Sequence, residues 1–568
     1  MDQGHPDRRM WVDSYVEEAM GLSSLNTYDV ISLEEYRRKY SHVKILPSMC
    51  VQTIKKDGDG RPVRAKSRIV ALGNHEDRIW EKCETFAPVL RDTTSRYLTS
   101  LATEYGRVEK QADAKNAFCN GILPDDETTI VRPPAGCPIS RPGQLWLLKK
   151  TLYGLRRSPI HWYRTIKSKL EEIGLRAMAH DPCLFYGHFE GHANPVYVGV
   201  YVDDLKYFSV SDEVEKIFEQ AIGSKLTIDF MGPVTWFLGC KYEHDITDDG
   251  KVTVSVTQTA KIEELQEKFG LVDCNPVDTP YRSGLVVDRI EHDSVHPEDK
   301  PELVRNYRSI IGGLLWINRQ TRPDISVIVS LLSRYNANPS KGHYEAARYV
   351  IRYLAGTADR GIRFTQDAGG KMCTNVGFPT TDGTYTDANW GPQDASHPRP
   401  GETVEVTDMQ SLMGHVVFRQ GGPIAWECKR ESKTMSRSSC EAEIYATDEG
   451  VKTTEMFRNL ERDLGLLDNK PTPVWNDNRG TVDWSKGCSV SRKLRHVNIR
   501  EMGVRLSQTQ GDVIIGHIEG KLNISDILTK EMKDKGHFCA LAQAITSPRQ
   551  WSQTEGGVET ARVGEFTG

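Results

Sequence analysis

The chain has 568 residues, of which 38% are hydrophobic and 27% charged, and its formal net charge is −5 at pH 7. A chain of this length is expected to hold roughly three or four domains, and its composition is that of an ordinary globular protein. The acidic balance gives no sign of a nucleic-acid binder, and the longest apolar runs are too short to span a membrane. The twelve cysteines form no C-x-x-C pair, which argues against zinc modules and a disulfide framework and favours a reducing compartment.

A hairpin is predicted over residues 48–73, where two strand-like runs flank a tight Asp-Gly turn. Residues 1–45 before it are predicted to form two helices that carry no chemistry. On the returning strand of the hairpin, Lys66 and Arg68 are two residues apart, so they share one face. A plain exposed edge strand would carry such residues as well.

Acidic residues end two further strand-like runs. Asp113 closes the first, and Asp203 and Asp204 lie at the tip of a hairpin predicted over residues 196–210 (VYVGVYVDDLKYFSV). Asp is common at turns, but the arms of this hairpin are apolar, so an ionised pair between them is costly unless a cation compensates. Three carboxylates on neighbouring strand ends form an oxygen-only site suited to two Mg²⁺ ions and to in-line phosphoryl transfer.

Basic and aromatic residues are interleaved over residues 146–169, where a loop (TLYGLRRSP) precedes an amphipathic helix. Such a face suits phosphate contacts, although solvated helix faces explain most basic runs. Residues 245–301 are polar and irregular and predict a domain boundary. Three helices follow, over residues 303–319, 324–336 and 343–356.

Residues 373–545 show strands and helices in an order that suggests a mixed sheet covered by helices. The predicted strands cover residues 383–390, 412–420, 423–429 and 473–477, and the predicted helices cover residues 436–450 and 524–532. Four acids fall at element ends, namely Asp387, Glu441, Asp477 and Asp526, and such a set can bind two Mg²⁺ ions that activate a water. Each acid also has a local explanation, because Glu441 satisfies the S-x-x-E capping pattern, Asp477 lies in a turn and Asp526 suits a helix start.

Three motifs, QADAKNAFCNG, LKKTLYGLRRSPIHW and YVDDL, resemble in this order the reverse transcriptase of copia-type LTR retrotransposons. TRPDIS and RYLAGT resemble the segment between polymerase and nuclease of these elements, and SSCEAE, NDN and SDILTK resemble their ribonuclease H motifs. The resemblance covers nearly the whole chain, from Trp11 to Met532. Cys119 and Cys440 depart from the family pattern, but neither is a proposed ligand.

The resemblance implies a role for each candidate residue. Catalysis and metal binding would fall to Asp113, Asp203 and Asp204 in the polymerase and to Asp387, Glu441, Asp477 and Asp526 in the nuclease, where His517 would shuttle a proton or help product release. The incoming nucleotide would meet Lys66, Arg68, Phe118, Tyr153 and Gly154. Primer and template would meet Arg156, Arg157, Trp236, Phe237, Leu238 and Gly239, the last four within a hairpin over residues 231–243. Core packing explains Phe118 and that hairpin as well, and His517 is equally explained as a surface histidine.

The expected fold is a multidomain α+β chain, in which a right-hand polymerase with fingers, palm and thumb precedes a ribonuclease H-like mixed α/β domain. Its expected divisions are a helical lead-in (1–45), fingers and palm (46–245), a linker with thumb-like helices (246–372), the nuclease (373–545) and a disordered tail (546–568). The start of the chain is expected to be a cut into a longer polyprotein.

The function predicted on this basis is an RNA- and DNA-directed DNA polymerase joined to a ribonuclease H. Each site would hold two Mg²⁺ ions, with Mn²⁺ as an alternative, and the partners would be an RNA template, a DNA primer and product, the RNA–DNA hybrid and dNTPs, without a membrane. The place of action would be cytoplasmic virus-like particles or the nucleus, and the sequence leaves the oligomeric state open. Two alternatives remain: a decayed or host-adopted element that only binds nucleic acid, and a nuclease whose polymerase half only grips the duplex.

Overall fold

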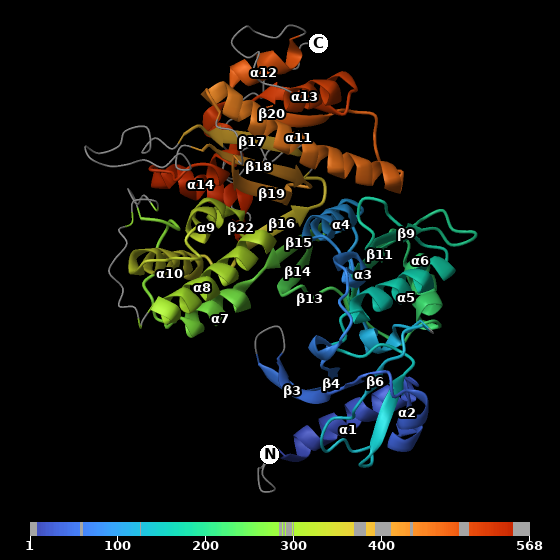
Figure 1. Cartoon of the computed structure of the whole chain (residues 1–568). Coiled ribbons are helices and arrows are strands. Elements are labelled where there is room, and N and C mark those ends of the chain that lie inside the picture. The colour runs from blue at the N-terminus through green and yellow to red at the C-terminus, as the bar shows by residue number, and fades with distance from the viewer. Residues whose placement is uncertain are drawn as a thin grey trace. The chain divides into compact units, whose positions relative to one another are not determined.

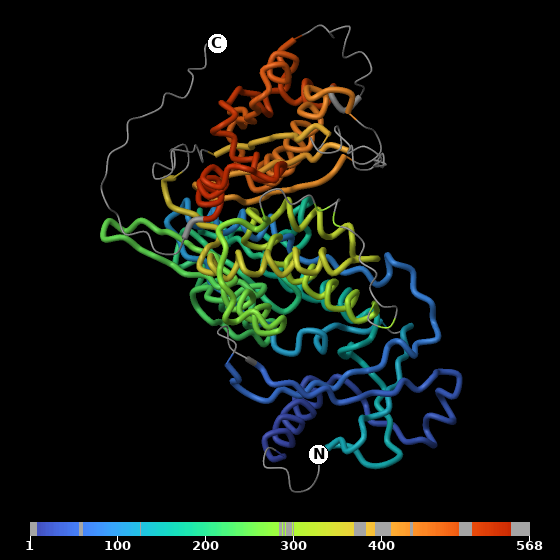
Figure 2. The backbone as a smooth tube through the Cα atoms, turned by 90° about the vertical axis from the view of Figure 1, so that its left-hand side faces the viewer, coloured from blue at the N-terminus to red at the C-terminus, as the bar shows by residue number. Residues whose placement is uncertain are grey.

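The chain folds as a mixed α+β protein of two compact units, Met1–Leu98 with Arg107–Phe237, and Thr99–Gly106 with Leu238–Gly568. The structure is a computed structural model, drawn as a cartoon in Figure 1 and as a backbone tube in Figure 2. It describes residues 8–56, 61–124, 126–282, 287, 290, 298, 300–368, 382–391, 410–431, 436–487 and 499–548. No helix in these ranges combines the length and the apolar character that crossing a bilayer requires.

The main sheet of the first unit has six antiparallel strands in the order β12-β5-β11-β10-β9-β8. Its strands are β5 (Lys110–Ala114), β8 (Arg176–Ala177), β9 (Leu184–Gly187), β10 (Val196–Tyr201), β11 (Asp204–Ser209) and β12 (Ile228–Pro233). Helices α5 (Ser158–Glu172) and α6 (Asp212–Gly223) pack on one face, against alternate residues such as Val196, Val198 and Val200. The other face meets α4 (Asp92–Glu104), where Leu98 lies against Gly199. Both faces of the hairpin β10–β11 are therefore buried.

The remaining elements of the first unit form a smaller layered group. The strands β1 (Tyr28–Ser32), β2 (Ile45–Leu46), β6 (Ile130–Val131) and β7 (Gln144–Leu148) form a sheet in the order β1-β7-β6-β2, and β3 (Ser48–Lys56) pairs with β4 (Pro62–Ala71) as a separate ribbon. Helix α1 (Arg8–Ser24) packs Ala19 and Leu22 against Ile69 and Ala71 of β4. Two short helices complete the group, α2 (Leu33–Lys39) and α3 (Lys82–Thr85), and strand β13 (Trp236–Phe237) ends the first unit.

The second unit begins with a helical group. Helices α7 (Thr259–Lys268), α8 (Lys300–Gln320), α9 (Ser326–Ser333) and α10 (Lys341–Ala355) share one core, which also takes in α14 (Lys535–Ile545). Figures 1 and 2 both show α8 and α10 side by side. Beside them the strands β14 (Cys240–Ile246), β15 (Val252–Thr257), β16 (Arg360–Thr365) and β22 (Ser547–Pro548) follow one another in one sheet.

A second sheet of this unit has the order β19-β18-β17-β20-β21, in which β17–β20 and β20–β21 are parallel pairs. Its strands are β17 (Gly383–Asn389), β18 (Leu412–Arg419), β19 (Gly422–Arg430), β20 (Thr472–Asn476) and β21 (Val513–His517). The long helix α11 (Ser439–Leu464), α12 (Arg479–Lys486) and α13 (Ile499–Thr509) pack over it around Ile444, Val474 and Val504. The predicted mixed sheet covered by helices is confirmed.

The predicted hairpin over residues 196–210 and the three predicted helices over residues 303–356 are also confirmed. The prediction of an irregular segment over residues 245–301 is wrong for part of its length, because β15 and α7 lie within it and β15 pairs with β14 and β16. The predicted helix over residues 524–532 is only a short 3₁₀ helix, Ile524–Leu528, whose N-cap Asn523 accepts from the Ser525 N–H and so closes a tight turn. Of the predicted tail, Ser547 and Pro548 pair with β16, and residues 549–568 lie outside the described part.

Gly154 has a conformation and surroundings that exclude a side chain. Its φ is +90°, and an added Cβ would lie 2.1 Å from the Ala71 carbonyl oxygen, so Gly154→Ala should cost roughly 3 kcal/mol or more in unfolding free energy. Gly136→Ala is the matched control, since Gly136 has a φ of +71° with open space around it and should lose only about 1–2 kcal/mol. Thermal unfolding of the two variants measures the difference, and equal destabilisation would contradict this packing.

Candidate active sites

The first site is built by strand register. Asp204 on β11 lies directly opposite Asp113 on β5, and facing residues of antiparallel strands point their side chains to the same side of the sheet. Asp203 occupies the two-residue turn before β11, where its carbonyl accepts from the Ala114 N–H at 2.8 Å and Val202 has a φ of +57°. A positive φ is an outlier for a β-branched residue. We call Asp113, Asp203 and Asp204 the hairpin carboxylates.

Burial and mutual repulsion act on the hairpin carboxylates together. Burial raises the pKa of Asp113, and the charge of Asp203 adds to this shift. The pKa of Asp204 rises to about 6, chiefly through burial and then through Asp203 and Asp113. Lys55 and Lys66 of the β3–β4 ribbon oppose the shift at Asp113. A cation near these carboxylates would relieve the remaining repulsion, and carboxylate oxygens are ligands that divalent metals prefer.

Four of the predicted nucleotide-binding residues lie together. Phe118 and Tyr153 meet edge to face at 5.3 Å between ring centroids, and the Arg68 guanidinium lies 5.3 Å from the centroid of the Tyr153 ring. Gly154 packs against β4, whose Ala71 N–H donates to the Tyr153 carbonyl at 2.8 Å. Lys66 is half-buried on the same ribbon as Arg68.

An apolar cavity of about 290 Å³ lies next to this group and to the turn of the hairpin. Phe118, Trp162 and Val202 line part of it, and the Trp162 indole N–H donates to the Val202 carbonyl at 2.6 Å. This hydrogen bond ties helix α5 to the turn that carries Asp203.

The predicted primer and template residues have different contact partners. The Arg156 side chain donates to the Gly73 carbonyl at 3.1 Å. Arg157 forms an ion pair with Glu127 and lies over the Trp80 ring. The other four predicted residues are consecutive. In β13, Trp236 is half-buried and Phe237 is buried, and the next two residues, Leu238 and Gly239, have φ values of +52° and +71°.

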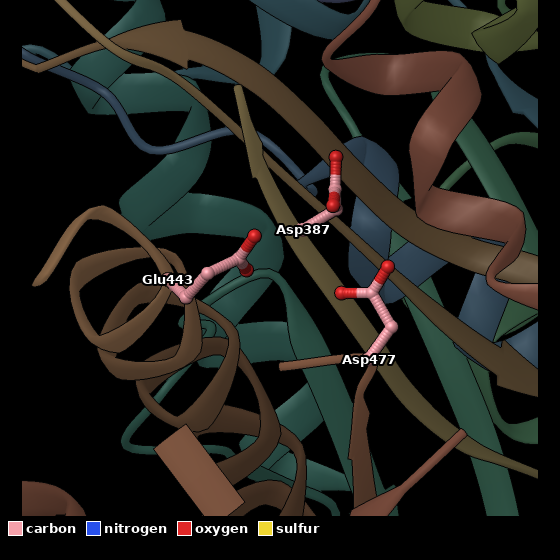
Figure 3. Close-up of side chains that lie close together, drawn as sticks. All are labelled: Asp387, Glu443 and Asp477. Carbon is pink, nitrogen blue, oxygen red and sulfur yellow. The ribbon is translucent and has the colours of Figure 1, made fainter. Parts of the chain in front are cut away.

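The second site gathers carboxylates from a strand, a helix and a strand end. Asp387 on β17, Glu443 on α11 and Asp477 directly after β20 each offer an oxygen within 4.8 Å of the others, and Figure 3 shows the three side chains converging. The parallel pairing of β17 with β20 places the two aspartates at the same sheet edge. Asn476 donates to Glu443 at 2.9 Å and so fixes its orientation. We call Asp387, Glu443 and Asp477 the carboxylate triad.

Glu441, the residue predicted for this place, instead lies in the first turn of α11. Its carboxylate accepts from the Arg437 N–H at 2.7 Å and from the Tyr445 hydroxyl at 3.1 Å. Two residues along a helix turn the side chain by about 200°, so only one of Glu441 and Glu443 can face the sheet. The sequence holds a signal for Glu443. This residue lies four positions before Thr447 and so shares its helix face, and the Thr447 hydroxyl contacts the Thr386 hydroxyl on strand β17.

Asp526 and His517 border the triad. Lys530 contacts Asp526 at 2.8 Å and Asp387 at 3.3 Å, so it links the two carboxylates, and Thr529 donates its hydroxyl to Asp387. His517 ends β21, and its Nε2 lies 3.2 Å from the Asp477 carbonyl oxygen. The sequence interpretation missed three residues of the two sites: Glu443 and Lys530 in the second site and Lys55 near the hairpin carboxylates.

Burial and charge raise the pKa values of the second site further. The pKa of Glu443 rises well above its ordinary range because of burial and then of Asp387. Burial followed by Asp387 likewise raises the pKa of Asp477, and raises that of Asp526 to about 7. Burial works against the charge of Lys530, but Asp387 and Asp526 outweigh it and raise the pKa of that ammonium. An oxygen-only, buried and strongly repulsive set of this kind fits a divalent cation.

Comparison with known proteins finds one family match and several similar polyproteins. Residues 25–283 match the family described as reverse transcriptase (RNA-dependent DNA polymerase). The chain is 27% identical over 540 residues to the retrovirus-related Pol polyprotein from transposon TNT 1-94 of Nicotiana tabacum, which covers 94% of this chain and 38% of that protein. It is also 27% identical over 493 residues to the Pol polyprotein from transposon RE1 of Arabidopsis thaliana, covering 87% of this chain and 31% of that protein.

A yeast relative agrees: the Gag-Pol polyprotein of transposon Ty1-DR6 from Saccharomyces cerevisiae is 22% identical over 560 residues, with 93% of this chain and 28% of that protein covered. The predicted resemblance is therefore confirmed: the chain is similar to one region of Ty1/copia-type retrotransposon Pol polyproteins, and its residues 25–283 match the reverse transcriptase family. The chain spans less than two fifths of the length of these relatives. A solved foamy viral protease-reverse transcriptase in complex with double-stranded DNA has a TM-score of 0.43 at 12% identity, covering 91% of this chain and 71% of that one, a likeness too weak to argue from.

The Mn²⁺ affinity of the chain should fall between pH 8 and pH 6, by roughly 10-fold, because metal ligands must be deprotonated. The pKa of Asp204 is raised to about 6 and that of Glu443 is raised as well, so protons compete with the ion over this interval as the pH falls. Isothermal titration calorimetry at pH 6, 7 and 8 measures the affinity and the protons released. An affinity that does not change with pH would contradict the raised pKa values.

Glu443→Gln and Glu441→Gln form a matched pair that separates the two glutamates of α11. Glu443→Gln should abolish Mn²⁺ binding at the triad and raise the melting temperature of the metal-free chain, because it removes one of three repelling carboxylates. Glu441→Gln should leave ion binding in place. Calorimetry and thermal unfolding of both variants measure these effects. Loss of ion binding in Glu441→Gln but not in Glu443→Gln would support Glu441 as the metal ligand.

Proposed function

We propose that this chain copies RNA and DNA into DNA at the hairpin carboxylates and degrades the RNA of the resulting hybrid at the carboxylate triad. The observation that carries the proposal is the pair of separate carboxylate clusters, the first half-buried and the second mostly buried, within a chain whose residues 25–283 match a reverse transcriptase family. Residues 46–245 would be the fingers and palm, 246–372 the linker and thumb-like helices, and 373–545 a ribonuclease H-like domain. The order β17-β18-β19-α11-β20 with its mixed sheet supports the last assignment.

In the polymerase, Asp113, Asp203 and Asp204 would hold divalent ions, with Mg²⁺ as the natural metal and Mn²⁺ as a substitute. Two such ions would lower the pKa of the primer hydroxyl and carry the charge of the triphosphate. The strand register holds Asp113 and Asp204 before any substrate arrives, so little reorganisation is needed on binding.

The group around Tyr153 would receive the nucleotide. The Arg68 guanidinium, held over the Tyr153 ring, together with Lys66 would offer positive charge to the phosphates. Phe118 stands against Tyr153, and its ring would leave no room for a ribose 2′-hydroxyl. Trp236, Phe237, Leu238 and Gly239 would hold the primer end. Since the Arg156 and Arg157 side chains are engaged by Gly73 and Glu127, they would serve the template chiefly by shaping its loop.

In the nuclease, Asp387, Glu443 and Asp477 would hold a divalent ion against the scissile phosphate of the RNA strand, and a bound metal would activate the attacking water. Asn476 keeps Glu443 aimed at the site. His517, at the end of the neighbouring strand, would hold or pass a proton at the rim. The partners would be an RNA template, a DNA primer, dNTPs and the hybrid, within virus-like particles or the nucleus.

A primer-extension assay on an RNA template, run beside a hybrid-RNA cleavage assay, tests both activities. The wild-type chain should show both with Mg²⁺, Asp203→Asn should lose extension by roughly 10³-fold or more while cleaving the hybrid, and Glu443→Gln should do the reverse. Hybrid cleavage without extension in the wild type would leave a nuclease whose first unit only grips the duplex. Hybrid binding with neither activity would leave a nucleic-acid-binding protein and overturn the proposal.

A further inference from the structure

Lys530 sits inside the second acidic site. Its ammonium lies 2.8 Å from Asp526 Oδ1 and 3.3 Å from Asp387 Oδ1, and the side chains of these two aspartates are only 12% and 1% exposed. The preceding residue, Thr529, donates its hydroxyl to the other oxygen of Asp387. Two consecutive residues thus bind both oxygens of the aspartate that also belongs to the carboxylate triad.

Asp387 therefore borders two gaps between carboxylates, each of which can hold a positive charge. One is the gap among Asp387, Glu443 and Asp477, whose oxygens come within 4.8 Å of one another. The other is the gap between Asp387 and Asp526, which the Lys530 ammonium occupies. Two-metal phosphodiesterases use a shared carboxylate in this way, with a cation on each side of it.

We propose that Lys530 supplies the second positive charge of this site, so that the triad binds a single divalent cation and the ammonium takes the place of the second. The inference rests on the proposed nuclease function and replaces the sequence expectation of two Mg²⁺ ions here. A metal bridging the same two Oδ1 atoms would need to lie about 2.1 Å from each, in the space the ammonium fills, and would be repelled by its charge.

A simple surface ion pair between residues four positions apart is the alternative role for Lys530, and such exposed pairs contribute little to stability. Three features distinguish Lys530 from such a surface pair. Its carboxylate partners are buried, one of them lies 143 residues away on the central strand β17, and the adjacent Thr529 binds the same group. This arrangement fixes the ammonium relative to the triad, which a local surface pair does not need.

The direct test counts Mn²⁺ ions bound to the full chain by calorimetry and electron paramagnetic resonance. All samples carry Asp113→Asn and Asp203→Asn, so that the count reports the second site. With Lys530 present one ion should bind there; Lys530→Met should admit a second, and Lys530→Arg, which keeps the positive charge, should again admit one. Lys535→Met is the matched control, since Lys535 pairs with the exposed Asp278 outside the site and its loss should change nothing.

Hybrid cleavage by the same samples gives a second readout. At Mn²⁺ concentrations that fill one site, Lys530→Met should cleave roughly 10²-fold more slowly, and its rate should recover in proportion to further Mn²⁺ as the second ion binds. Two ions bound with Lys530 present, or one ion bound in the folded Lys530→Met chain, would overturn the inference. Thermal unfolding verifies that each variant is folded. If Lys530→Met is unstable, Lys530→Arg provides the test, because two ions bound to the Lys530→Arg chain would also overturn the inference. Failure of the nuclease proposal is distinguishable, since it shows as no hybrid cleavage with Lys530 present whatever the ion count.

Discussion

Repulsion between carboxylates that folding forces together is the constraint on which both sites depend. At the hairpin, backbone register alone fixes Asp113 opposite Asp204, so the two charges cannot separate without breaking the sheet. In the second unit the parallel pairing of β17 and β20 does the same for Asp387 and Asp477, and α11 brings Glu443 to them. The packing of apolar residues such as Val198 and Val474 must offset this local cost when no cation is bound.

The two sites receive positive charge in different ways. At the hairpin carboxylates the basic residues whose charges act on Asp113, Lys55 and Lys66, come from the β3–β4 ribbon, a separate two-stranded element. At the triad the basic residue is Lys530, held within the site by Asp387 and Asp526. The first site therefore takes its positive charge from another sheet, whereas the second takes it from a lysine that contacts two of its own carboxylates.

Sequence patterns predict best what depends on strand alternation and apolar periodicity. The hairpin around Asp203 and the helices over residues 303–356 follow from such patterns, and the pairing of Asp113 with Asp204 follows from two strands that both end in acids. The choice between Glu441 and Glu443 depends on helix phase, which a motif containing both glutamates does not settle. The prediction missed strand β15 although its sequence, VTVSVT, alternates as a strand does and pairs with the adjacent β14 as well as with β16. The tight turn capped by Asn523 interrupts an otherwise helical pattern.

Locating bound Mn²⁺ by anomalous scattering, in crystals of the chain with a primer–template duplex, tests the central claim most directly. Anomalous peaks are expected among Asp113, Asp203 and Asp204, with a separate peak among Asp387, Glu443 and Asp477. Mn²⁺ bound only at other residues, with both carboxylate clusters empty, would contradict it.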